Sequence, residues 1–123
     1  MTTSDAVSAS QTATTGGRKF DGGKTQFGLM PPFALKEFAD VLTYGAKKYE
    51  PDNWKRVPDA KRRYFDAAMR HMWEWKRLEK TDPETGLHHM AHAMCCLAFI
   101  IDIEMDPSII NDINNPNSEV NPK

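Results

Sequence analysis

The sequence predicts an all-α fold with three core helices, and three observations carry this prediction. Two segments, 32–49 and 59–80, repeat their apolar residues at helical spacing, so each has one apolar face. A third segment, ending near residue 105, is apolar on nearly every side from Met90 to Ile103, as expected for a helix buried between others. The chain of 123 residues allows one domain, and we expect oligomerisation to complete its small core.

The charge balance excludes a general affinity for polyanions. The chain has 16 basic and 17 acidic residues, a net charge of -1, so we expect neither nucleic acid nor a membrane surface as a partner. Cys95 and Cys96 are adjacent in an apolar helical run and cannot readily form a disulfide with each other. Reduced thiols, with no signal-like or membrane-spanning segment, predict a cytoplasmic protein.

Both ends of the chain are expected to lie outside the folded domain. Residues 1–17 are mainly Ser, Thr, Ala and Gly, a composition that predicts a disordered arm. Residues 107–123 are rich in Asn, Pro and Ser and predict an irregular tail, in which isoleucines such as Ile109 could hold a short segment on the bundle. The predicted domain is therefore 18–106.

The first helix is predicted from Pro32 to Tyr49, because proline suits a first helical turn. Before it, Gly22-Gly23-Lys24 could approach a phosphate, but a simple turn is the favoured interpretation. After it, Asn53 and Trp54 place an amide beside an indole, a combination that can hydrogen-bond to a base and stack on it. A tryptophan that closes the loop against the core explains the same residues equally well.

The second helix, 59–80, has two polar residues in its apolar arc, His71 near the centre and Glu79 toward one side. A carboxylate in a core is costly unless it is paired, protonated or bound to a metal. Taken singly, His71 could be a hydrogen-bonded core histidine and Glu79 a residue of a frayed last turn. Met69 and Trp73 lie on the opposite side, which indicates a second buried face and hence a homodimer or homotetramer.

The third helix is predicted to begin at Pro83 or Gly86, with Asp82 as its cap, and to end at Met105. Its first turns carry His88, His89 and His92, whose spacing of three or four residues lets pairs of rings point at one place. Imidazoles together with carboxylates suit a first-row divalent ion, which can polarise a phosphoryl group and activate water. Zinc protease chemistry fits poorly, because His89 occupies the position where that motif requires glutamate.

Three stretches carry a family resemblance: FDGGKTQFGLMPP, YGAKKYEPDNW and MRHMWEWKRLEKTDPETGLHHMAHAMCCLAFI. Together they resemble the N-terminal domain of phage dATP/dGTP diphosphohydrolases, relatives of the MazG-like all-α nucleoside triphosphate pyrophosphohydrolases. The resemblance implies a MazG-like helix bundle in the host cytoplasm. It also implies hydrolysis of dATP or dGTP to the monophosphate and pyrophosphate with Mg²⁺ or Mn²⁺.

The resemblance and the residue chemistry together assign three groups of site residues. The predicted catalytic residues are His71, Glu79 and Asp82. The predicted metal ligands are Glu79, Asp82, Glu84, His89 and His92. The predicted substrate-binding residues are Lys47, Lys48, Tyr49, Asn53, Trp54 and Arg70.

Two features depart from the related families. The chain contains no Glu-Glu dipeptide, although the MazG-like group carries Glu-Glu-x-x-Glu on one helix. Leu78 stands where the phage family usually has glycine before the glutamate. The alternative hypothesis is therefore a non-catalytic nucleotide-binding or structural phage module that retains the pocket.

Overall fold

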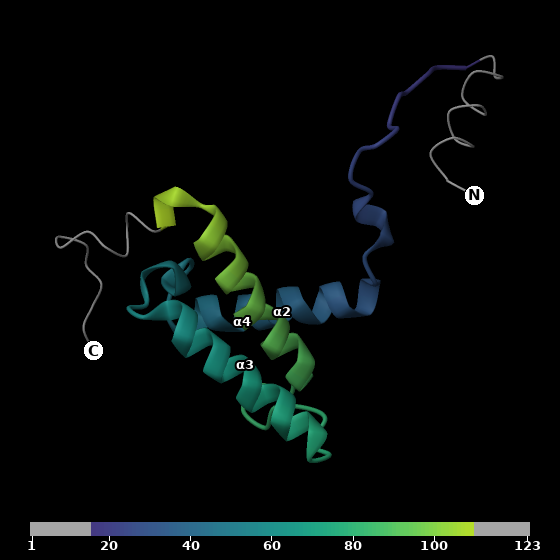
Figure 1. Ribbon diagram of the computed structural model, residues 1–123. Helices are drawn as coiled ribbons and strands as arrows, with labels where there is room; N and C mark the ends of the chain where they lie inside the picture. The colour runs from purple at the N-terminus through teal and green to yellow at the C-terminus, as the bar shows by residue number, and fades with distance from the viewer. Residues whose placement is uncertain (1–15, 110–123) are drawn as a thin grey trace. The chain divides into compact units, whose positions relative to one another are not determined.

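The computed structural model of the protein describes residues 16–109, which fall into two units. In the first, residues 16–30, the 3₁₀ helix η1 spans Phe27–Leu29, and the amide of Lys24 donates to the carbonyl of Asp21 across the predicted glycine turn. The second unit, which begins at Pro31, contains the helices α2, α3 and α4 (Figure 1). Most of the predicted arm and tail lies outside the described residues, although Ile109 is described and is buried.

Helix α2 spans Pro32–Lys48, as the sequence predicts to within one residue. Its inward face is formed by Phe38, Val41 and Leu42, which pack against residues of α4. The chain then passes through the 3₁₀ helix η2, Asn53–Arg56, which is preceded by Asp52 in the left-handed conformation. This short helix carries Trp54 back onto the core.

Helix α3 spans Ala60–Lys76 and ends four residues before the predicted Lys80. The amide of Leu78 donates to the carbonyl of Trp75 and that of Glu79 to the carbonyl of Glu74, a Schellman C-cap. Leu78 itself has a φ of 79°. The chain therefore leaves the helix before Glu79, which the helical pattern had placed on α3.

Helix α4 spans His89–Met105 and begins later than the predicted Pro83 or Gly86. Asp82 caps a turn over residues 82–86 rather than the helix, and His88 serves as the N-cap, its Nδ1 accepting from the amide of Met90. The expectation that α4 is buried all round is wrong for the single chain. Its exposed apolar side chains are Met94, Leu97, Ile101 and Met105.

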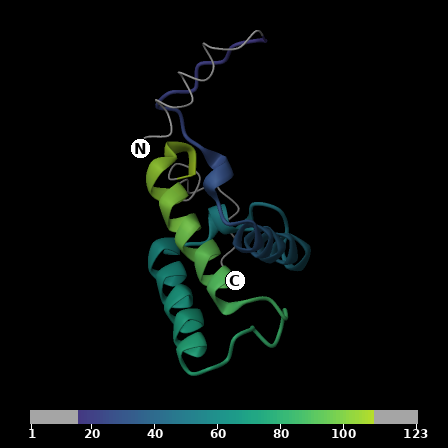
Figure 2. The same cartoon turned by 90° about the vertical axis from the view of Figure 1, so that its right-hand side faces the viewer.

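Small residues allow α3 and α4 to pack closely. Ala68 is fully buried and Ala93 is 2% exposed, and both belong to one core cluster with Cys96. The two helices lie side by side and run in opposite directions, and α2 crosses α4 (Figures 1 and 2). Within residues 16–109, no helix has the length and hydropathy needed to span a membrane.

Candidate functional site

Five predicted site residues meet where α3 ends and α4 begins. His71 lies on α3, Glu79 and Asp82 on the connection, and His89 and His92 on α4. The reversal of the chain between the two helices brings them together, because His71 precedes the end of α3 by less than two turns and His89 opens α4. We call these five side chains the histidine–carboxylate cluster.

His89 is the centre of the cluster and is only 2% exposed. Its Nδ1 lies 2.9 Å from Nδ1 of His71, and its Nε2 lies 2.7 Å from Oε1 of Glu79. An ionised carboxylate can only accept, so Nε2 of His89 donates to Glu79. In the tautomer with its single proton on Nε2, Nδ1 of His89 accepts from Nδ1 of His71. These contacts form a hydrogen-bonded chain from His71 through His89 to Glu79, whose side chain is 46% exposed.

His71 and His92 stack on one another, with ring centroids 4.6 Å apart. Burial, together with the neighbouring His92 and His89, lowers the pKa of His71 to about 4. Burial also lowers the pKa of His92. Both rings are therefore neutral at physiological pH and keep a lone pair available for an ion or a proton.

Asp82 is held by its own loop. Its Oδ2 accepts from the amides of Glu84 and Thr85, both at 3.0 Å, and from the Thr85 hydroxyl at 3.3 Å. Partial burial raises the pKa of Asp82, but these hydrogen bonds and nearby His92 outweigh it and hold the pKa below the usual range. Thr85 also contacts Nε2 of His92 at 2.8 Å and so links the loop to α4.

The cluster can hold a metal ion. His71, Asp82 and His89 each offer one ligand atom, and these atoms lie within 4.8 Å of one another. Two imidazoles and a carboxylate are a ligand set of first-row divalent ions. Three predicted ligands, Glu79, Glu84 and His92, are not in this group, whereas His71, predicted as catalytic, is. Oε2 of Glu84 accepts instead from the Tyr44 hydroxyl at 2.5 Å and from Nζ of Lys48 at 3.0 Å.

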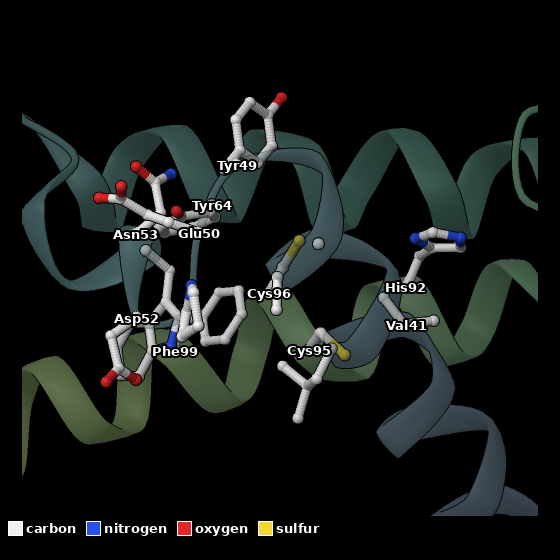
Figure 3. A pocket seen from close by; sticks show the side chains of 15 residues that line it. Val41, Tyr49, Glu50, Asp52, Asn53, Tyr64, His92, Cys95, Cys96 and Phe99 are labelled. Atoms are coloured by element: carbon white, nitrogen blue, oxygen red, sulfur yellow. The ribbon is translucent and has the colours of Figure 1, made fainter.

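A largely apolar pocket of about 420 Å³ adjoins the cluster. His92 lies at one end of it and Asn53 at the other (Figure 3). His92 therefore belongs to both the cluster and the pocket. The thiols of Cys95 and Cys96 also line the pocket, but burial raises their pKa to about 12 and about 11, so neither is a thiolate nucleophile.

The predicted base-binding residues Tyr49, Asn53 and Trp54 all line this pocket. Trp54 also stacks on Phe99, with ring centroids 4.4 Å apart and planes at 11°. Phe99 thus covers one face of the indole. Trp54 both packs the loop against the core and lines the pocket.

The predicted phosphate-binding residues are dispersed. Lys48 pairs with Glu84, and Lys47 is exposed. Arg70 lines a second cavity of about 690 Å³, which shares Tyr49 and Asn53 with the first. Two further arginines line this second cavity, Arg56 and Arg63.

Sequence reasoning missed several of these residues. Thr85 carries no signal of its own, because its role depends on the path of the loop between two helices. Tyr44 lies on α2, far along the chain from its partner Glu84. The basic runs Lys55-Arg56 and Lys61-Arg62-Arg63 were visible signals for the second cavity.

Fold and site define a helical domain in which a histidine–carboxylate cluster able to bind a metal ion adjoins an apolar pocket. Residues 14–113 match the family model described as dATP/dGTP diphosphohydrolase, N-terminal, and the chain belongs to this family. A protein of Salmonella phage PMBT28 named dATP/dGTP diphosphohydrolase is 43% identical over 84 residues. These cover 68% of this chain and 28% of that relative, so the chain matches less than a third of the relative's length. No solved structure matches significantly.

Proposed function

We propose that this chain is a metal-dependent nucleotide diphosphohydrolase domain that cleaves dATP or dGTP to the deoxynucleoside monophosphate and pyrophosphate. The observation that carries the proposal is His92, which joins the histidine–carboxylate cluster to the pocket. The name of the phage relative supplies the substrate class.

The substrate would lie along the pocket, with its base at the Asn53 end. The Asn53 amide offers hydrogen bonding to a purine. The Trp54 indole lines the same end of the pocket, with Phe99 stacked on it and Nζ of Lys55 5.7 Å from its centroid, so a purine would have to displace the Lys55 side chain to stack there. The phosphates would then lie toward His92 and the cluster. Positive charge for the triphosphate would come from Lys48, which pairs with Glu84, from Arg70, which lines the second cavity, and from the exposed Lys47.

The cluster residues would handle the proton of the attacking water. A bound Mg²⁺ or Mn²⁺ would polarise the phosphoryl oxygens and lower the pKa of water. Glu79 is exposed enough to meet water and is oriented by His89, so its carboxylate is placed to accept a proton. Asp82, His71 and His89 offer ligand atoms within 4.8 Å of one another, whereas Glu79 contacts His89 through the other ring nitrogen.

The test is direct. We expect purified protein to release pyrophosphate from dATP or dGTP with Mn²⁺ or Mg²⁺, and Glu79→Gln to lower the rate about 100-fold or more. Glu74→Gln is the matched control, because Glu74 lies on the same helical end but pairs with Arg77. It should keep the full rate.

A second candidate is a non-catalytic nucleotide-binding module. The observation that favours it is coverage, since the activity in the relative's name belongs to a whole protein of which this chain matches only 28%. Binding of dATP or dGTP without pyrophosphate release, with either metal, would support the module and refute the hydrolase. Neither binding nor hydrolysis would refute both.

A further inference from the structure

We propose that the histidine–carboxylate cluster binds one transition-metal ion through Nδ1 of His71, Nδ1 of His89 and a carboxylate oxygen of Asp82, and that it prefers Mn²⁺ to Mg²⁺. This inference rests on the proposed function and deepens it, since the hydrolase proposal leaves the ion open.

The separation of the two imidazole nitrogens fits an ion between them. They lie 2.9 Å apart. Two nitrogens bound at about 2.1 Å to neighbouring corners of one ion lie about 3.0 Å apart. The nitrogens therefore have the spacing of adjacent ligands. The ring centroids are 5.1 Å apart, so the two nitrogens point at one another, and both rings have to turn to aim their lone pairs at one ion.

The protons can be placed without charging either ring. His89 donates from Nε2 to Glu79, which leaves its Nδ1 free. His71 needs only to move its proton from Nδ1 to Nε2, a change of tautomer in a neutral ring.

The surroundings match those of metal-binding histidines. Such histidines usually donate their second ring N–H to a carboxylate, which fixes the ring and strengthens the ligand, and Glu79 does this for His89. Asp82 is fixed in the same way, since Oδ2 holds three hydrogen bonds. Within residues 16–109, its other oxygen has no hydrogen-bond partner and is available as a ligand.

The ligand set decides the type of ion. Mg²⁺ favours oxygen ligands in near-ideal octahedral geometry, whereas imidazole suits ions of the first transition row. Two of the three ligand atoms here are nitrogens. Neither cysteine belongs to this group of ligand atoms, so the set contains no softer sulfur ligand.

The experiment measures binding rather than activity. Chelator-stripped protein is titrated with Mn²⁺ and with Mg²⁺ by calorimetry, and the Mn²⁺ form is examined by pulsed electron paramagnetic resonance for coupling to ¹⁴N. We expect one equivalent of Mn²⁺, binding at least about tenfold tighter than Mg²⁺, with a signal from directly bound imidazole nitrogen. His71→Ala should weaken Mn²⁺ binding about tenfold or more.

The matched control is His88→Asn, which changes the neighbouring histidine while keeping an N-cap for α4. It should leave Mn²⁺ affinity unchanged. If a histidine variant folds poorly, the paramagnetic resonance spectrum of the unaltered protein still tests whether imidazole nitrogen binds Mn²⁺.

Three outcomes separate this inference from the hydrolase proposal. Equal affinity for Mg²⁺ and Mn²⁺ without nitrogen coupling would overturn the inference and leave the hydrolase intact. Failure of the folded protein to bind either ion would overturn it and reduce the contact between His71 and His89 to a structural hydrogen bond. Nitrogen-coupled Mn²⁺ in a protein that hydrolyses no nucleotide would support the inference and refute the hydrolase.

Discussion

Leu78 occupies a backbone conformation that glycine adopts most easily. Its φ of 79° costs an L-residue on the order of 1 kcal/mol, and its side chain, 92% exposed, recovers almost nothing by burial. The residue nevertheless ends α3 and turns Glu79 toward His89. The glycine that the family resemblance implies at this position would adopt the same φ without strain.

We therefore predict that Leu78→Gly stabilises the protein by about 1 kcal/mol and raises the melting temperature by a few degrees. Leu78→Ala is the control, because alanine keeps the strained conformation and should give little gain. Thermal unfolding followed by circular dichroism measures both. A Leu78→Gly variant no more stable than Leu78→Ala would contradict the strain argument.

At the scale of elements, the contact between α3 and α4 depends on small side chains. Ala68 is fully buried against a cluster that contains Ala93 and Cys96. A larger residue at Ala68 has to push the helices apart, which also separates His71 from His89. The packing of α3 on α4 therefore also sets the distances within the histidine–carboxylate cluster.

We predict that Ala68→Leu costs about 1–3 kcal/mol of unfolding free energy, the usual cost of overpacking a core. Ala39→Leu, on an exposed position of α2, should stay within about 0.5 kcal/mol of the original protein. Urea denaturation measures the difference. Equal stability of the two variants would show that the contact between α3 and α4 accommodates a leucine without overpacking.

At the scale of the whole molecule, several large apolar side chains remain uncovered in the single chain. Phe65, Met69 and Trp73 follow one another at four-residue spacing on α3 and are 52%, 45% and 61% exposed. A stripe of this kind on a short chain favours association with a second subunit. The predicted homodimer or homotetramer thus remains a proposal, with this stripe as its expected contact.

We expect light scattering coupled to size-exclusion chromatography to give the mass of a dimer or tetramer, and Trp73→Glu to shift the protein toward monomer. Phe33→Glu, which also replaces an exposed aromatic but on α2, should leave the mass unchanged. A monomer at every concentration would exclude the oligomer.

The sequence by itself determined the three helices and pointed to the histidines, because helical periodicity fixes which side chains share a face. It placed α2 to within one residue, but it extended α3 to Lys80 and so put Glu79 on the helix. Periodicity contains no information on how a chain reverses between helices.

Only the tertiary structure decided how the site is assembled. The turn at Leu78 and the loop around Asp82 place Glu79 on His89, Thr85 on His92 and Glu84 against α2. The sequence pattern of one segment does not say which residues of another segment it contacts. These contacts therefore depend on the path of the connection and on the close approach of α3 and α4. The sequence shows which residue types are present, but not the distances between them in the folded protein.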